Sequence, residues 1–422
     1  MDESLYWGRS GKQATVIELK CVLARDLDVE ALKNALLNSL KVHTNFRTRP
    51  LFAKHRFWSM TDDVKEPPMF KENGRPRRLG TNETNGLMLY VSYKVRSFTL
   101  HVFHGIADLR SISAFLNTLL KFYYYPSASE QIVLPAPDSS DTFGCYEEIL
   151  KNGAPAKTNN RYAPKKHDIF HIPEKSYGEK TTKQRVFEID LPLKPFLAFT
   201  KENKSSVVPT LNAVIGHAIH QQYNVGNKDI TCYVPVDLRP VFHFESGGNA
   251  PAAFTLPYSR KMEDLSLGKR AMYLRNIMKT QTKPESLYKY VADLKKKFDI
   301  VYSLRLPVGL LSKLVVKIGR EIDRRSYTYG ISYGGKVSFG EGIYPHVVSI
   351  SAAAGSYSYP LWIIACEYNG VIRMKFIQSY ESDKLVKAIY GDLAERFPGT
   401  RLRDQDHHMF DEFHIKCIPH RR

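Results

Sequence analysis

The chain has 422 residues, of which 43% are hydrophobic and 25% are charged. This length exceeds one ordinary hydrophobic core, so two lobes or domains are expected, and the composition is that of a globular protein and argues against disorder. The net charge of +18 at pH 7 favours anionic partners, such as nucleic acid, a phosphorylated cosubstrate, an acidic carrier protein or an anionic membrane.

The first part of the chain predicts strands and helices in alternation. Period-two patterns of apolar residues indicate strands, and 3.6-residue periods indicate amphipathic helices. The predicted elements are a strand at 14–24, a helix at 26–43, a short strand at 57–60, a hairpin of strands at 86–94 and 97–104, and a helix at 110–125. The second hairpin strand ends at His104, and Asp108 lies close to the N-cap of the following helix.

A long segment without periodicity separates the two halves. From Pro126 to about Gln184 the regular pattern is lost, and residues 151–185 carry nine basic side chains against three acidic ones. The sequence therefore predicts four regions, which are a first lobe with His104 (1–150), a basic connection (151–184), a second lobe (185–397) and a His-rich tail (398–422).

The second half again alternates strands and helices, as expected of mixed α/β sheets. The predicted strands are 185–191, 229–238, 328–333, 346–354, 361–368 and 371–378, and the predicted helices are 209–223, 262–281, 284–300, 308–325 and 382–397.

The N-terminus and the cysteines indicate a cytoplasmic protein. The first residues show no basic start followed by an apolar run, and no apolar stretch approaches the roughly eighteen residues of a spanning helix. Five cysteines, at positions 21, 145, 232, 366 and 417, are odd in number and lack Cys-x-x-Cys spacing. We therefore expect reduced thiols and not a disulfide framework.

His104 is a candidate general base. An imidazole at a strand end, before a glycine-containing loop, is suited to take a proton from a hydroxyl or amine near neutral pH. The spacing His-x-x-x-Asp alone also fits a strand that turns into a capped helix. Arg47 offers a partner for a buried carboxylate, so we expect Asp108 to pair with Arg47 and to hold the loop, unless Arg47 is only surface charge.

Five segments together carry a resemblance to a known family. They are FRTR (46–49), HGIAD (104–108), VPVDLRP (234–240), GGNAPAAF (247–254) and ISYGGKVSFGEG (331–342). In this order, and over about 14–397, the sequence resembles the CoA-dependent acyltransferase superfamily. That superfamily includes chloramphenicol acetyltransferase, plant BAHD acyltransferases and peptide-synthetase condensation domains. Within it, the sequence looks closest to the bacterial alcohol acetyltransferase and wax ester synthase group.

The resemblance implies an α/β fold with two chloramphenicol-acetyltransferase-like lobes, each a mixed sheet flanked by helices, and a tunnel between them. It implies that His104 is the general base, that Asp108 and Arg47 form a structural salt bridge, and that Ser332 is a candidate oxyanion or tunnel contact. The cosubstrate would be an acyl thioester, carried by CoA or an acyl carrier protein, and the acceptor a small alcohol or, as second choice, an amine. No bound cofactor and no metal are required.

Two residues depart from the family pattern. Leu109 follows the aspartate where the family usually has glycine, which leaves open whether the loop keeps its shape. Phe103 stands where condensation domains have a second histidine, which favours simple acylation of an alcohol or amine over peptide condensation. A degenerate acyltransferase that serves as a binding module is therefore an alternative to an enzyme.

Two other site types compete with this hypothesis. Residues 330–334 match Gly-x-Ser-x-Gly, so Ser332 could be the nucleophile of a serine hydrolase, although the glycine-rich segment that follows does not predict the required helix. Zinc-ligand types gather in the tail, but their spacings fit no zinc finger. These tail residues are His407, His408, His414, Cys417 and His420.

The basic residues are concentrated between 260 and 325, a segment that contains 17 basic and seven acidic side chains. Nucleic acid is not the expected partner, because interleaved aromatics and recognition motifs are lacking. The segment suits the phosphates of CoA or an acidic carrier protein, and the predicted helix at 308–325 could also rest on an anionic membrane.

Overall fold

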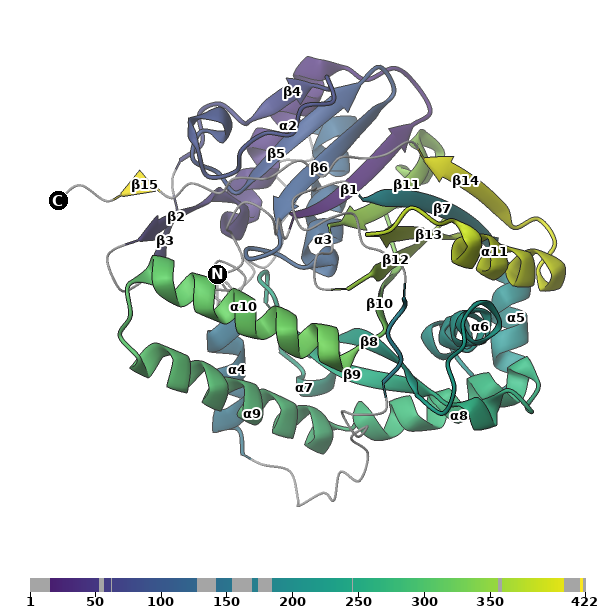
Figure 1. Ribbon diagram of the computed structural model, residues 1–422. Helices are drawn as coiled ribbons and strands as arrows, with labels where there is room; N and C mark the ends of the chain where they lie inside the picture. Colours follow the sequence, from purple (N-terminus) through teal and green to yellow (C-terminus); the bar gives the residue numbers. More distant parts are fainter. Residues whose placement is uncertain are drawn as a thin grey trace.

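Three sheets organise the part of the chain that the structure describes (Figure 1). The computed structural model describes residues 16–52, 57–61, 63–126, 142–153, 169–173, 184–244, 246–355, 359–405 and 418–419. Two large sheets form the two lobes, and a small three-stranded sheet lies at the edge of the molecule (Figure 1).

The first sheet has the strand order β11-β1-β6-β5-β4. Its strands are β1 (Val16–Leu23), β4 (Met69–Lys71), β5 (Leu89–Lys94), β6 (Ser97–Phe103) and β11 (Val347–Ala354). The sheet is mixed, because β4 runs parallel to β5 while the other pairs are antiparallel. The amphipathic helices α2 (Val29–Val42) and α3 (Leu109–Tyr124) share a buried core with this sheet, as their apolar stripes predict.

The second sheet has the strand order β14-β7-β13-β12-β10-β8-β9 and is also mixed, because β10 is parallel to both β8 and β12. Its strands are β7 (Arg185–Pro192), β8 (Ile230–Asp237), β9 (Pro251–Tyr258), β10 (Tyr329–Lys336), β12 (Leu361–Tyr368), β13 (Val371–Gln378) and β14 (Arg401–Gln405). The helices packed on it are α5 (Leu193–Glu202), α6 (Val207–Gln222), α8 (Leu267–Gln281) and α11 (Lys384–Arg396). The sequence prediction missed α5 and β9.

The two sheets confirm the predicted fold of two mixed sheets flanked by helices, but their strands cross the predicted boundary between the lobes. β11 lies in the range assigned to the second lobe, yet it pairs antiparallel with β1 of the first sheet from Ile17↔Ala354 to Leu23↔Val347. β14 lies in the range assigned to the tail, yet it pairs with β7 in the second sheet.

The range 142–151 forms a helix that the sequence did not predict. This helix, α4 (Thr142–Lys151), belongs to the predicted first lobe but packs on α9 (Pro284–Ser303) of the second. The Tyr146 hydroxyl donates a hydrogen bond to the carbonyl of Pro251 at 2.6 Å. Buried side chains of both helices, such as Ile149 and Leu287, share a third small core.

The remaining elements lie at the periphery. α10 (Val308–Ser326) crosses the front of the molecule (Figure 1). The small sheet contains β2 (Thr48–Phe52), β3 (Phe57–Thr61) and β15 (Ile418–Pro419). In the described ranges, no helix has the length and apolar character needed to cross a membrane. The four cysteines of these ranges are free and buried, and Cys417 lies outside them.

Candidate active site

β6 delivers His104 to the junction of the two lobes. The strand is buried along its whole length, and the chain turns directly after Phe103. The turn is tight, because a Cβ on Gly105 would lie 2.2 Å from Cε1 of the Phe103 ring. This close approach, and not an unusual backbone angle, makes glycine necessary there.

The half-buried His104 imidazole is not committed to a structural hydrogen bond. Its buried Nδ1 has no hydrogen-bond partner among the described residues. Two other shielded histidines are engaged: Nε2 of His43 lies 2.9 Å from the Thr118 hydroxyl, and Nδ1 of His217 lies 2.9 Å from a carboxylate oxygen of Glu263. The buried Nε2 of His220, like Nδ1 of His104, has no partner in the described ranges. The His104 ring is therefore free to exchange a proton with a bound molecule.

Asp108 has two structural functions, one for each carboxylate oxygen. Oδ1 caps α3 by accepting a hydrogen bond from the Ser111 backbone N–H at 2.9 Å, as the sequence predicted. Oδ2 accepts a hydrogen bond from Nη1 of Arg239 at 2.8 Å. Both bonds fix the start of α3, and with it the loop that carries His104.

The predicted partner of Asp108 was wrong. Arg47 ends a short 3₁₀ helix, η1 (Thr44–Arg47), and pairs at 3.0 Å with Asp63, whose side chain is almost fully exposed. The arginine that reaches Asp108 comes instead from the Asp-Leu-Arg-Pro segment at 237–240. The motif was recognised in the sequence, but its arginine was given no function there.

Arg239 is the centre of a buried polar network between the lobes. Its side chain is 6% exposed, and Nη1 contacts Asp237 at 3.0 Å in addition to Asp108. Nε donates a hydrogen bond to the Ser246 carbonyl at 2.9 Å, and Nη2 donates to the carbonyl of Gly248. Burial alone would lower the pKa of Arg239, but the two carboxylates outweigh it and raise that pKa.

The loop at 246–249 of the second lobe holds the His104 loop directly. The Asn249 amide donates a hydrogen bond to the backbone carbonyl of His104. The Asn45 amide, on the first lobe, bridges the carbonyls of Ile106 at 3.2 Å and Gly247 at 2.8 Å. Asn45, Arg239 and Asn249 were not identified from the sequence, although Asn249 belongs to the GGNAPAAF segment that carried part of the resemblance.

Leu109 is the first residue of α3 and needs no left-handed backbone, so the helix start keeps its form without glycine. Its side chain packs against Gly334 of β10, where an added Cβ would lie 2.5 Å from Cδ2 of Leu109. A small residue in the second lobe therefore makes room for the larger residue in the first.

The structure does not support a serine nucleophile at Ser332. The residue lies half-buried within strand β10, where it pairs with Ile364 of β12, and a loop and not a helix follows the strand. A nucleophile elbow requires a sharp turn from strand to helix. Of the histidines that follow Ser332, His346 stacks on Tyr124 with ring centroids 4.4 Å apart, and His407 and His408 lie outside the described residues.

Within the described ranges, no group of three or more His, Cys, Asp or Glu side chains could hold a metal ion. The zinc-ligand types of the tail fall outside these ranges. They are His407, His408, His414, Cys417 and His420.

The chain matches no protein-family profile and no curated protein by sequence. Its structure is similar to the first condensation domain of the CDA synthetase, with a TM-score of 0.61, 13% identity, and 94% of each chain covered. It is similar to a trichothecene 15-O-acetyltransferase from Fusarium sporotrichioides, with a TM-score of 0.59, 10% identity, and 94% of each chain covered. It is also similar to a second F. sporotrichioides protein, solved with coenzyme A and T-2, with a TM-score of 0.57, 9% identity, and coverage of 94% of this chain and 98% of that chain. The chain therefore has the two-lobed fold that condensation domains and CoA-dependent acetyltransferases share.

Proposed function

We propose that the protein is an acyltransferase that moves an acyl group from a thioester to an acceptor hydroxyl, with His104 as general base. One observation carries the proposal. The His104 loop is fixed by the second lobe, through the Asp108–Arg239 pair and the Asn249 amide, while the imidazole has no hydrogen-bond partner for Nδ1 in the described ranges. A rigid backbone with an uncommitted imidazole is what a general base requires.

The proposed reaction has one base and no covalent enzyme intermediate. An imidazole nitrogen of His104 takes the proton of the acceptor hydroxyl while the hydroxyl oxygen attacks the thioester carbonyl carbon. The tetrahedral intermediate then expels the thiolate, which receives the proton from the imidazolium. Ser332, half-buried on β10, is the proposed hydrogen-bond donor to the oxyanion. In this reaction scheme the two substrates reach His104 through a tunnel between the lobes.

The donor is proposed to be acyl-CoA or an acyl carrier protein, and the acceptor a small alcohol, with an amine as second choice. The fold similarity to a protein solved with coenzyme A supports a CoA thioester, and the basic helices of the second lobe suit its phosphates. Residues 151–184 are the proposed connection between the lobes. The proposed compartment is the cytoplasm, where free thiols such as the buried Cys21 remain reduced.

A thiol-release assay with a panel of acyl-CoA donors and alcohol acceptors tests the proposal. We expect turnover by the wild-type protein and a loss of about 100-fold or more in His104→Ala, in line with the usual contribution of a general base. Ser332→Ala should keep a measurable part of the activity. Turnover that is unchanged in His104→Ala, or absent with every donor and acceptor, would favour a degenerate binding module.

We also propose that α10 rests on an anionic membrane. Four apolar side chains spaced four residues apart remain exposed along it: Leu310 at 54%, Leu314 at 39%, Ile318 at 49% and Ile322 at 50%. The exposed Lys313 and Lys317 flank this stripe, while Leu311 turns inward to the core. An apolar stripe beside a row of cations is the pattern of a helix at a lipid surface.

A further inference from the structure

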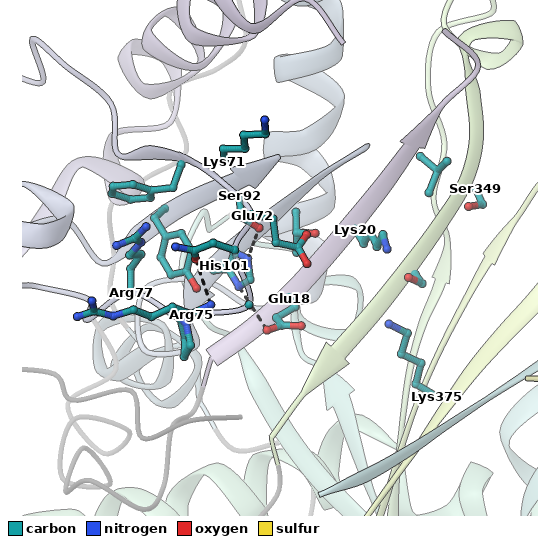
Figure 2. Close-up of a pocket in the computed structure, with 18 of the residues that line it drawn as sticks. Glu18, Lys20, Lys71, Glu72, Arg75, Arg77, Ser92, His101, Ser349 and Lys375 are labelled. Atoms are coloured by element: carbon teal, nitrogen blue, oxygen red, sulfur yellow. Dashed lines mark hydrogen bonds and ion pairs between the residues drawn. The ribbon is translucent and has the colours of Figure 1, made fainter. Parts of the chain in front are cut away.

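The open face of the first sheet carries a polar cavity that is separate from His104. Residues of β1, β5, β6 and β11 line it from the first sheet, the segment 70–77 borders it, and β7, β13 and β14 contribute from the second sheet. Its volume is about 240 Å³, and His104 is not among the lining residues. Figure 2 shows many of the charged side chains of this cavity, among them Lys20 and Lys375.

The lining has an excess of four positive charges when His101 is neutral. Each of its three carboxylates has a basic neighbour. Glu18 lies 3.3 Å from His101, Glu72 lies 2.9 Å from Lys94, and Glu188 lies 3.3 Å from Arg373. The seven basic residues are Lys20, Lys71, Arg75, Arg77, Arg373, Lys375 and Arg403.

Lys375 is the most unusual member of this set. Its side chain reaches into the cavity from β13, and the residue is only 7% exposed (Figure 2). Two residues earlier, Arg373 forms a bidentate pair with Asp190, at 2.6 and 2.9 Å. Among the described residues, no carboxylate forms an ion pair with Lys375. Burial destabilises this ammonium more than the carboxylates of Glu188 and Glu18 stabilise it, and a bound anion would reduce the remaining cost.

A second ammonium lies close to the first. Lys20 projects from β1 toward the same hollow, and Figure 2 shows both lysines at its border. Burial lowers the pKa of Lys375. The carboxylates of Glu188 and Glu18 raise this pKa, whereas the Lys20 ammonium lowers it further. Two like charges that face one cavity are stabilised by an anion that contacts both.

The rest of the lining indicates a polar ligand. Hydroxyl groups border the cavity from three strands of the first sheet, and they can donate to further oxyanion oxygens. They belong to Thr99, Ser349 and Ser351, and to Ser92, whose Oγ also lies 2.8 Å from Nε2 of His101. We propose that this cavity binds a small phosphate-bearing molecule, whose phosphate lies between Lys20 and Lys375.

Calorimetric titration with inorganic pyrophosphate tests the site. The wild-type protein should bind it, and Lys375→Met and Lys20→Met should each weaken binding about tenfold or more, since a charge-assisted contact is lost. Lys201→Met, which removes an exposed lysine of α5 outside the cavity, should change the affinity by less than about twofold. No pyrophosphate binding by the wild-type protein, or equal loss in all three variants, would overturn the proposal.

Two controls separate this site from the proposed acyl transfer and from misfolding. His104→Ala should bind pyrophosphate like the wild-type protein, and loss of binding in that variant would place the anion at His104 and refute a separate site. Lys375→Met should melt at least as high as the wild-type protein without ligand, because the desolvation cost of a buried ammonium is gone, and pyrophosphate should no longer raise its melting temperature.

Discussion

At the scale of single residues, Arg239 and Arg47 form a natural test pair. Removing Arg239 leaves Asp108 and Asp237 close together without their shared cation, so we expect Arg239→Met to lower the free energy of unfolding by about 3 kcal/mol. Arg47→Met breaks a pair whose acidic partner is exposed, and its effect should stay below about 1 kcal/mol. Urea denaturation at pH 7 measures both, and equal effects would contradict the central position of Arg239.

His43 gives the protein a pH dependence of known sign. Burial lowers the pKa of His43 from 6.5 to about 4. Because the folded pKa lies below the unfolded one, the unfolded chain binds the extra proton between these values, and stability falls as the pH drops from 6.5 to 4. The loss from this group should reach about 3 kcal/mol.

The variant His43→Gln isolates this contribution, since glutamine does not titrate. We expect its stability to depend less steeply on pH than that of the wild-type protein between pH 6.5 and 4, in chemical denaturation at a series of pH values. Parallel pH profiles would show that His43 takes up its proton equally well in the folded protein.

The sequence predicted the positions of His104 and Asp108 because strand periodicity and helix capping are local signals. It did not identify the partner of Asp108, because a pairing between distant segments leaves no periodic trace. Arg47 and Arg239 were both in recognised segments, and only the packing of the second lobe on the first distinguishes them.

At the scale of elements, the contact of Leu109 on α3 with Gly334 on β10 predicts a coupling between two positions. Gly334→Ala should destabilise the protein by about 1 kcal/mol, because the new methyl group meets the Leu109 side chain. Adding Leu109→Ala should relieve much of this effect, so the two changes should be non-additive in a double-mutant cycle. Gly340→Ala is the matched control, since nothing lies within 4 Å of its added Cβ.

The exposed face of α10 predicts binding to lipid vesicles. The wild-type protein should cosediment with vesicles that contain phosphatidylserine, and less with vesicles of phosphatidylcholine alone, because the exposed lysines attract the anionic surface. Leu314→Glu with Ile318→Glu should abolish cosedimentation while the fold is retained, as both side chains are exposed. Absence of the wild-type protein from the anionic pellet would exclude this surface as a membrane contact.

Element prediction succeeded where a period was long and unbroken, as in α2, α3 and β10 to β13. It missed α4 because this helix is flanked by segments without periodicity, and its apolar side chains fill only a small core that it shares with α9 and the end of β9. It missed β9 because the strand begins at Pro251 directly after a glycine-rich loop, where the local signals indicate a turn.

At the scale of the whole molecule, the two lobes should unfold together. β11 completes the first sheet, and the Arg239 network and the Asn249 amide cross between the lobes. We expect far-UV circular dichroism and tryptophan fluorescence to report one coincident transition in urea. Two separated transitions would show that the contacts between the lobes contribute little.

The two-lobed architecture could be predicted because the order of five segments resembled a known superfamily, whereas composition and length gave only the number of lobes. The assignment of strands to lobes could not be predicted from the sequence. A strand that joins the sheet of the other lobe has the same period-two pattern as a strand that joins the sheet of its own lobe. The exchange of β11 is set by the pairing of β1 with a strand more than 300 residues away in the chain.

The exchanged strand also limits how this protein can be recombined with its structural neighbours. A chimera joined near residue 185 would give the first sheet a foreign strand in place of β11, and a mismatched register would move apolar side chains to the wrong face. Functional hybrids should therefore be obtained when residues 347–354 are inherited together with the N-terminal half. The unit that can be transplanted is defined by the sheet and is not a continuous stretch of the gene.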